Sequence, residues 1–449
     1  MIMSDVICAI ATPPGKGGIG IIRISGKDAI VIADKIFHTA GSNSLLVKKN
    51  GTFSYGRIID NNKIIDSCIA LVMHNPNSFT GENTVELQTH GGPIVLKLVL
   101  TCIINAGARL AEPGEFSKRA FLNGKIDLTQ AEAICDLINA KSDKAASLAI
   151  QQLEGSLTIS LEYIYDSLLE ITANLETTID FIEDELPDDV FSNIKDLFFK
   201  SKLNLQNLLL TWNQGRVLRD GIDVAILGKP NSGKSTLLNS LLGYDRAIVS
   251  DIAGTTRDII EEGIIIDDIL VRIKDSAGLR DTNCEIESEG IKRAESLKES
   301  SDFIFYIIDG SVEIDKQDLL AIESLPKKTT LIILNKIDKG CCVDIKSGVK
   351  ISLLHDNINI IKAQFIKLIE NNINKIDTNT MISERHKMIL EKVNKELILV
   401  EELLNNIEEN AVVICSHLRN SLDFIGQITG RIYHNDLLEN IFSRFCIGK

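Results

Sequence analysis

The stretch that decides the fold is DVAILGKPNSGKSTLL, residues 223–238. It reads as an apolar strand, a glycine-bounded loop and the start of a helix, and it fits Gly-x-x-x-x-Gly-Lys-Ser without a mismatch. Gly228 and Gly233 permit backbone conformations in which successive N–H groups point at phosphate oxygens, and the helix N-terminus strengthens such a site. Lys234 is expected to reach the terminal phosphates and Ser235 to bind Mg²⁺. The stretch predicts a nucleotide site without saying which nucleotide.

The base is predicted from a second motif about a hundred residues downstream. The apolar strand TLIIL, residues 330–334, is followed by Asn335, Lys336 and Asp338 in the arrangement Asn-Lys-x-Asp. The Asp338 carboxylate can accept from guanine N1–H and from the 2-amino group, whereas adenine offers neither donor. A carboxylate buried without a partner against adenine would be costly, so the motif predicts guanine specificity.

Two stretches between these motifs resemble the switch elements of GTPases. In SDIAGTTRD, residues 250–258, Thr256 is the expected Mg²⁺ ligand that senses the γ-phosphate. DSAG, residues 275–278, follows the strand VRIK and matches Asp-x-x-Gly, in which Asp275 holds Mg²⁺ through water and the Gly278 amide meets the γ-phosphate. The predicted GTP-binding residues are Asn231, Ser232, Gly233, Lys234, Ser235, Thr236, Ser250, Asp251, Ile252, Ala253, Gly254, Thr255, Thr256, Asp275, Ser276, Ala277, Gly278, Asn335, Lys336 and Asp338.

The residue after Gly278 is Leu279, where Ras-like enzymes carry a glutamine that orients the attacking water. Hydrolysis therefore needs another water-positioning group and another positive charge. The acids of EIESE, residues 285–289, are candidates for the first, and an arginine or a bound cation for the second. Asn231 could lend its amide oxygen to a monovalent ion, or it could be a turn former in a tight loop, and the sequence leaves both open.

Length and composition indicate the broad class of protein. A chain of 449 residues with 44% hydrophobic and 24% charged residues predicts a core-forming protein of two to four domains. The net charge of −14 argues against a general nucleic-acid coat, although a local basic patch or an RNA-holding partner is compatible with it. The nine cysteines lack metal spacing, and no apolar run reaches membrane-spanning length, so we expect reduced thiols and a cytoplasmic location.

The periodicity of the chain changes three times. Residues 1–120 alternate between short strands and two helical stretches, which predicts an α+β domain. The predicted strands are 6–11, 20–25, 53–59, 64–73 and 85–89, and the helical stretches lie near 28–37 and 93–106. Residues 121–218 carry apolar residues at spacings of three and four, and the same period returns in 377–449, from Ile389 to Ile432. The P-loop domain, 219–376, is thus expected to be inserted between two halves of one helical domain. The predicted fold is multidomain α/β plus α: an N-terminal α+β domain, a helical bundle and an inserted Ras-like G domain.

Motifs at both ends of the chain resemble the tRNA-modification GTPase family MnmE (TrmE). They are ATPPG (11–15), IIRISG (21–26), NSFTGE (77–82), THGGP (89–93), PGEF (113–116), AFLNGKIDL (120–128) and IFSRFCIGK (441–449). The resemblance covers the whole chain, and the terminal motif beside an internal G domain is specific to the family.

The resemblance implies an N-terminal domain that forms a homodimer and binds a one-carbon donor, 5-formyl- or 5,10-methylene-tetrahydrofolate. Arg23, Glu82, Lys125 and Lys449 match the family's folate-binding positions. Arginine and lysine suit the carboxylates of folate, and a glutamate can accept from the donor edge of the pterin. Cys446 matches a family cysteine near that site, and it also reads as an apolar filler.

The family further implies a K⁺-dependent GTPase whose G domains pair across their switches. K⁺ takes the place of an arginine finger, with ligands matching Asn231, Ser250, Ile252 and Thr255, and the water-positioning acid matches Glu287. A heterotetramer forms with the flavoprotein MnmG (GidA), which carries FAD and uses NADH. Together they add an aminomethyl or carboxymethylaminomethyl group at C5 of the wobble uridine of certain tRNAs.

One departure concerns the guanine pocket. Ser352-Leu353-Leu354 stands where the family has Ser-Ala-Lys or Ser-Ala-Arg, which is expected to weaken nucleotide affinity without affecting Asp338. The alternative function is a ribosome-assembly or regulatory RNA-binding GTPase without modification chemistry, although no basic RNA-binding appendage is evident. A pure scaffold is hard to reconcile with Lys234 and Ser235.

Overall fold

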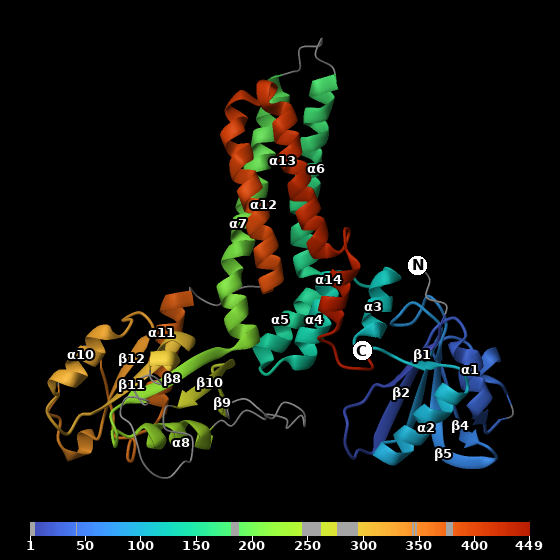
Figure 1. Ribbon diagram of the computed structural model, residues 1–449, viewed down its shortest axis with the longest axis horizontal. Coiled ribbons are helices and arrows are strands. Elements are labelled where there is room, and N and C mark those ends of the chain that lie inside the picture. The colour runs from blue at the N-terminus through green and yellow to red at the C-terminus, as the bar shows by residue number, and fades with distance from the viewer. Residues whose placement is uncertain are drawn as a thin grey trace. The chain divides into compact units, whose positions relative to one another are not determined.

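The computed structural model describes residues 5–41, 43–180, 188–244, 262–275, 295–343, 345, 348–373 and 380–449. The chain forms two compact units, one of Met1–Cys135 with Asn420–Lys449 and the other of Asp136–Arg419 (Figure 1). The first unit therefore contains both ends of the chain. Among the described residues, no helix is long and apolar enough to cross a membrane.

The first unit is built on a seven-stranded sheet of order β3-β4-β5-β6-β2-β1-β7. Its pairs are antiparallel except that β7 runs parallel to β1. The strands are β1 (Ile7–Ile10), β2 (Ile19–Ser25), β3 (Phe37–Thr39), β4 (Thr52–Asp60), β5 (Lys63–Met73), β6 (Thr84–His90) and β7 (Arg109–Leu110). The helices are α1 (Ala29–Ile36), η1 (Leu45–Val47), α2 (Pro93–Asn105), α3 (Glu115–Leu122) and α14 (Asn435–Phe442).

The two faces of this sheet differ. On one face, α1 and α2 pack against alternate strand residues such as Ile22, Ile24 and Leu87 and form the core. The opposite face carries an apolar patch that we call the outer patch: Phe53, Tyr55 and Ile69, of which Tyr55 and Ile69 are cross-strand neighbours. Phe53 is 75% exposed and Tyr55 is 61% exposed. Strand alternation thus leaves large apolar side chains on an open surface.

The C-terminal segment packs on N-terminal residues of the same unit. A Cβ added to Gly114 would lie 2.5 Å from the Phe442 carbonyl oxygen, and one added to Gly448 would lie 2.4 Å from the Ile10 carbonyl oxygen. Both glycines have positive φ, +67° and +101°. Only glycine permits these two close approaches without strain.

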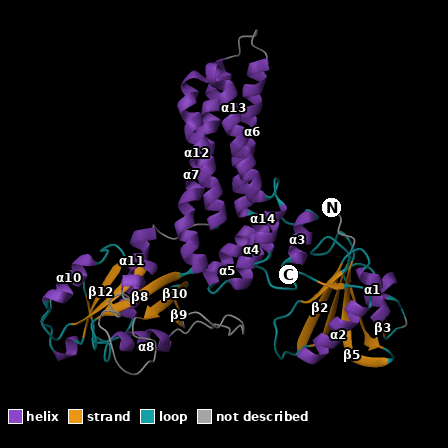
Figure 2. Ribbon diagram, viewed as in Figure 1, coloured by secondary structure: helices purple, strands orange, loops and turns teal. Residues whose placement is uncertain are grey.

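The second unit begins with long helices whose two sequence segments pack together (Figure 2). The Lys202 ammonium pairs with Glu401, Arg419 Nη2 lies 2.6 Å from Glu176 Oε1, and Lys387 lies over the Trp212 ring. The helices are α5 (Asp143–Leu153), α6 (Ser156–Asp180), α7 (Asp188–Asp220), α12 (Glu384–Leu403) and η3 (Leu404–Asn406), together with α4 (Leu128–Asn139) and α13 (Ile407–Thr429), whose residues are divided between the two units. The contacts therefore join residues before and after the P-loop domain.

The predicted apolar stripes are only partly correct in register. On α12 the fully buried residue at the start of the stripe is Leu390, whereas the predicted Ile389 is half-buried. Ile432, the last residue of the predicted apolar stripe, is 39% exposed. Helical spacing of three and four leaves the phase uncertain by one residue where two apolar residues are adjacent.

The same unit contains a six-stranded sheet of order β13-β12-β11-β8-β10-β9, parallel except for β9. Along β8, Val224 and Ile226 face one core while Ala225 and Leu227 face the other. The continuous apolar run thus reflects a strand covered on both faces. The elements are β8 (Ile222–Gly228), α8 (Lys234–Tyr244), β9 (Glu262–Ile266), β10 (Ile269–Asp275), β11 (Phe303–Asp309), α10 (Lys316–Ser324), β12 (Thr330–Asn335), η2 (Ile337–Lys339), β13 (Val349–Lys350) and α11 (Asn359–Ile373).

Candidate functional site: a guanine-nucleotide pocket

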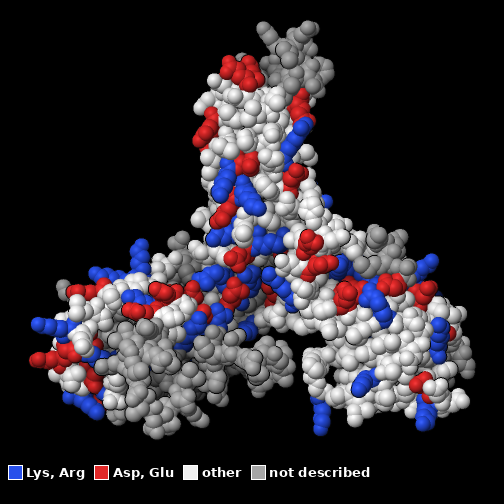
Figure 3. Space-filling view, in the orientation of Figure 1, with Lys and Arg blue, Asp and Glu red and all other residues white. Residues whose placement is uncertain are grey.

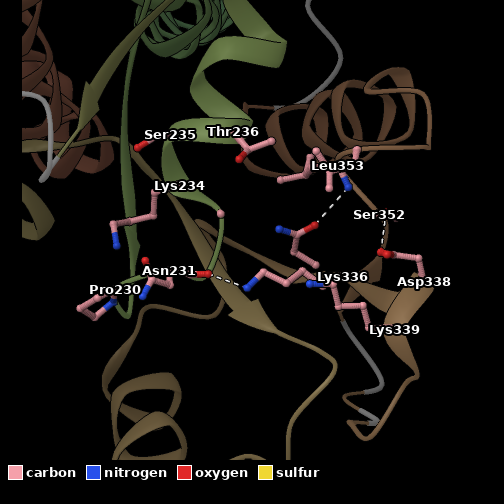
Figure 4. Close-up of a pocket in the computed structure, with 13 residues that line it drawn as sticks. Pro230, Asn231, Lys234, Ser235, Thr236, Lys336, Asp338, Lys339, Ser352 and Leu353 are labelled. Carbon is pink, nitrogen blue, oxygen red and sulfur yellow. Dashed lines mark hydrogen bonds between the residues drawn. The ribbon is translucent and has the colours of Figure 1, made fainter.

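A cavity of about 520 Å³ opens where β8 and β12 end. The carboxyl ends of neighbouring parallel strands are the usual ligand position in such sheets. Its walls combine the phosphate loop, the Asn-Lys-x-Asp motif and the loop that follows β13 (Figure 4). The lining residues are Pro230, Asn231, Gly233, Lys234, Ser235, Thr236, Asn335, Lys336, Asp338, Lys339, Ser352, Leu353 and Leu354. Two motifs about a hundred residues apart in sequence therefore form one site.

The phosphate loop depends on its two glycines. At Gly228, φ is +144° and an added Cβ would lie 2.3 Å from the Ile307 carbonyl oxygen. At Gly233, φ is +111° and an added Cβ would lie 2.2 Å from Asn335 Nδ2. Lys234 Nζ donates to the Gly228 and Lys229 carbonyls at 2.9 and 2.8 Å, so its ammonium lies across the loop.

Ser232 lies in the phosphate loop but does not line the cavity. It is 2% exposed, and its hydroxyl has no hydrogen-bond partner among the described residues. A glycine-bounded loop with a lysine ammonium across it fits a phosphate group.

The base end of the pocket is organised around Asn335 and Asp338. Asn335 is buried, donates from Nδ2 to the Ser232 carbonyl at 2.9 Å and accepts from the Leu353 amide at 3.1 Å. Ser352 Oγ donates to Asp338 Oδ1 at 2.6 Å, and this hydrogen bond lowers the pKa of Asp338 below its usual value. The Asp338 side chain is exposed to the cavity as a carboxylate acceptor, and Leu354 beside it is 73% exposed.

Lys336 connects the base end to the phosphate loop. Its Nζ donates to the Asn231 carbonyl and to Asp309 Oδ2, both at 2.7 Å. Asn231 itself has φ +61°, so it does adopt a turn conformation that favours asparagine and glycine. Asp309 was not predicted from the sequence. The available signal was an aspartate that ends a strand immediately beside the Asn-Lys-x-Asp strand.

Several predicted residues lie outside the described part of the chain. Asp275 ends β10, but its side chain is not described. The residues outside the described ranges are Ser250, Asp251, Ile252, Ala253, Gly254, Thr255, Thr256, Ser276, Ala277, Gly278, Leu279 and Glu287. The switch and cation assignments therefore remain predictions.

Three of the four predicted folate positions lie in one region of the first unit. The Arg23 guanidinium donates to Glu86 at 2.8 Å and lies 5.6 Å from the ring centroids of both Phe79 and Phe116. Two residues along β2, Ser25 donates to Glu82 Oε2 at 2.8 Å.

The other two predicted folate positions, Lys125 and Lys449, are each placed by a neighbouring glycine. A Cβ on Gly81 would lie 3.2 Å from Lys125 Cγ, so Lys125 packs against the residue that precedes Glu82. Lys125 Nζ donates to the Pro76 carbonyl at 3.2 Å. Lys449 follows Gly448, which contacts the end of β1.

Arg119 is a buried residue of this region that sequence reasoning missed. It is 1% exposed, and its Nη1 donates to both carboxylate oxygens of Glu82 at 3.2 Å. Its Nη2 donates to Glu115 Oε1 and Asp5 Oδ1, both at 2.9 Å. Burial raises the pKa of Glu115, but hydrogen bonds from Arg109 and Arg119 hold it below its usual value. Glu82 is thus held beside a fixed positive charge.

A phosphate loop and an Asn-Lys-x-Asp motif that close one pocket on a mostly parallel sheet define a P-loop GTPase. Two family models match the chain: "GTP-binding protein TrmE N-terminus" over residues 6–125 and "MnmE helical domain" over residues 128–446. The chain belongs to the MnmE (TrmE) family of tRNA modification GTPases.

Individual relatives agree with this assignment. The tRNA modification GTPase MnmE of Clostridioides difficile is 40% identical over 100% of both chains, and that of Aquifex aeolicus is 38% identical over 100% of both. Among solved structures, Aquifex aeolicus Era bound to GDP·AlF4⁻ is 25% identical and covers 40% of this chain and 67% of its own. Its TM-score is 0.24, so it adds nothing to the assignment.

Proposed function

We propose that this protein is a K⁺-dependent GTPase that, with the flavoprotein MnmG (GidA), adds a carboxymethylaminomethyl or aminomethyl group to C5 of the wobble uridine of certain tRNAs. A tetrahydrofolate supplies the one-carbon unit, and the partner carries FAD and uses NADH in the cytoplasm. The observation that carries the proposal is the match of two family models over nearly the whole chain, together with a guanine pocket of matching chemistry.

The pocket supports GTP as the substrate. Asp338 offers an acceptor to guanine, and Lys234 lies where a terminal phosphate would replace its two carbonyl partners. Mg²⁺ would neutralise charge on the β- and γ-phosphates, with Ser235 and Thr256 as its protein ligands. Ser235 lines the pocket at the start of α8, which fits this role.

The monovalent-cation part is tested by steady-state hydrolysis at constant ionic strength. We expect GTP turnover several-fold higher in KCl than in NaCl, because K⁺ would supply the charge that an arginine finger supplies elsewhere. Equal rates in the two salts would remove the cation role from Asn231, Ser250, Ile252 and Thr255. This part can fail while the GTPase assignment stands.

Glu287 is proposed as the water-positioning acid. Glu287→Ala is expected to lose hydrolysis while it retains GDP affinity, and Glu289→Ala, the same change two residues on, serves as the control. Unchanged GTP turnover in Glu287→Ala would show that Glu287 does not position the attacking water.

The folate part is supported by the region around Glu82. Arg23 and Lys125 are cations suited to carboxylates, and Phe79 and Phe116 flank the Arg23 guanidinium. Glu82, held by Ser25 and Arg119, remains an acceptor for the donor edge of a pterin. These groups fit the chemistry of folate at both ends of the molecule.

Folate binding is tested by calorimetric titration of the full chain with 5-formyl-tetrahydrofolate. Arg23→Met is expected to weaken binding at least tenfold, since it removes a charge-assisted contact. Arg57→Met, the same change at an exposed position of the sheet, should leave affinity within twofold. No binding to the native chain would favour the alternative of an RNA-binding GTPase without modification chemistry.

The outer patch supports a homodimer through the first unit. Phe53 and Tyr55 are large apolar side chains that lie mostly exposed on one sheet face. A second copy of the chain would cover them. On the face in Figure 3, basic and acidic side chains are interspersed along the long helices.

The proposed role in wobble-uridine modification is tested in cells that lack the protein. Mass spectrometry of tRNA nucleosides should show wobble uridines without the C5 group, and the native chain should restore it. Intact modification in such cells would overturn the proposed function.

A further inference from the structure

The carboxylate of Asp309 does not line the nucleotide pocket, but it accepts a hydrogen bond from a residue that does. Asp309 is the last residue of β11 and is the register partner of Asn335, the first residue of the guanine motif. It is absent from the cavity wall, yet its Oδ2 accepts from Lys336, which is part of that wall. We propose that Asp309 is a positioning residue that fixes Lys336, and through it the phosphate loop, for nucleotide binding.

The Asp309 carboxylate is itself held in one orientation. Its Oδ1 accepts from the Ser311 amide at 3.1 Å and from the Ser311 hydroxyl at 2.6 Å. The Gly310 amide donates to the Asn335 carbonyl at 2.7 Å, and an added Cβ on Gly310 would lie only 3.0 Å from that oxygen. The two hydrogen bonds from Ser311 thus hold Oδ1 and leave Oδ2 to accept from Lys336.

Lys336 carries this constraint to the other motif. Its backbone is left-handed at φ +63°, and its Nζ bonds both Asp309 and the Asn231 carbonyl. Asn231 is also left-handed, so the direction of its carbonyl depends on a conformation that costs energy for a residue other than glycine. A fixed ammonium on that carbonyl stabilises the conformation. Without Asp309, the long lysine side chain would have a single fixed partner here.

Two possible roles for Asp309 predict opposite changes in nucleotide affinity when its negative charge is removed. If its only effect on an anionic nucleotide were electrostatic, removing the negative charge would tighten binding, because the repulsion falls. If it positions Lys336, removing the charge would weaken binding, because the lysine and the loop lose their fixed geometry. The sign of the change therefore separates a positioning role from a charge effect.

The matched control is Asp315, a second aspartate that pairs with a lysine of the phosphate loop. Asp315 and Asp318 bind Lys229, which does not line the cavity. Asp315 also caps α10 through the Asp318 amide, a role that asparagine can keep. Asp315→Asn therefore makes the same charge change nearby without touching a pocket lysine.

The experiment measures the affinity of the full chain for a fluorescent GDP analogue. Asp309→Asn, which is isosteric, is expected to bind about fivefold more weakly, since it loses a charge-assisted hydrogen bond at a partly exposed site. Asp315→Asn is expected to bind equally well or slightly more tightly. Binding by Asp309→Asn that is as tight as the native chain, or tighter, would overturn the proposal.

Hydrogen exchange of the nucleotide-free chain provides a second readout that does not require binding. Peptides that cover 229–233 should exchange faster in Asp309→Asn, while peptides of 361–369 in α11 should not change, which separates local loosening from unfolding. In a Lys336→Met background, Asp309→Asn should add no further increase, because the link is already broken. An equal further increase would show that Asp309 acts by another route.

Discussion

The buried amide of Asn335 ties three loops together, and its removal has a calculable effect. Asn335→Ala deletes the donor to the Ser232 carbonyl at 2.9 Å and the acceptor for the Leu353 amide at 3.1 Å. Each buried group left unpaired costs about 1–3 kcal/mol. Because the adjoining cavity can admit water to both groups, the lower end applies, about 2 kcal/mol in total, which is a factor of about 30 in an equilibrium constant.

The assay combines hydrogen exchange with nucleotide titration. The Leu353 amide should lose protection in Asn335→Ala, and GDP affinity should fall about 10- to 30-fold, because the bound state needs both loops in place. Asn372→Ala is the control: Asn372 is exposed, and its Nδ2 also donates to two carbonyls, those of Lys328 and Leu368. Its affinity should stay within twofold. Unchanged Leu353 protection with near-native affinity in Asn335→Ala would refute the reasoning.

Three further predictions concern pH, packing and thiol reactivity. Ser352→Ala removes the hydrogen bond that lowers the pKa of Asp338. Binding that needs the carboxylate is lost as pH falls through this pKa, so the acid limb of a GDP-affinity profile should move to higher pH. Gly448→Ala should expose the C-terminus to carboxypeptidase, whereas Gly124→Ala, also at positive φ but with open space around it, should not. Burial raises the pKa of the Cys8 thiol to about 12, so alkylation followed by peptide mapping should label it only after denaturation.

The strands of the first unit could be predicted because their pattern is simple. Alternation places β4 and β5 within a few residues of their actual bounds, since one face of an antiparallel sheet is buried and the other is open. The two strands that escaped prediction, β3 and β7, have three and two residues, which is too short for any periodicity to show. Pairing with distant strands, rather than local sequence, makes them strands.

The candidate site could be predicted only where its residues belong to a sequence motif that is associated with a known ligand. Lys234 and Asp338 both line the cavity, and each stands at a fixed spacing from the glycine or asparagine of its motif. Asp309 and Arg119 were missed because their roles arise from neighbours distant in sequence: Asp309 acts on a lysine 27 residues away, and Arg119 on a glutamate 37 residues away. No local pattern contains such a pair.

The position of residues 420–449 has a consequence for biosynthesis. They are translated after every residue of the GTP pocket, yet they belong to the same unit as the first 135 residues, with Gly448 against Ile10 and Phe442 against Gly114. Domains usually fold as they leave the ribosome, N-terminal first. A nascent chain that already contains every residue of the GTP pocket therefore still lacks the segment that packs on Ile10 and Gly114, so the packing of the first unit is finished only after the second unit has been made.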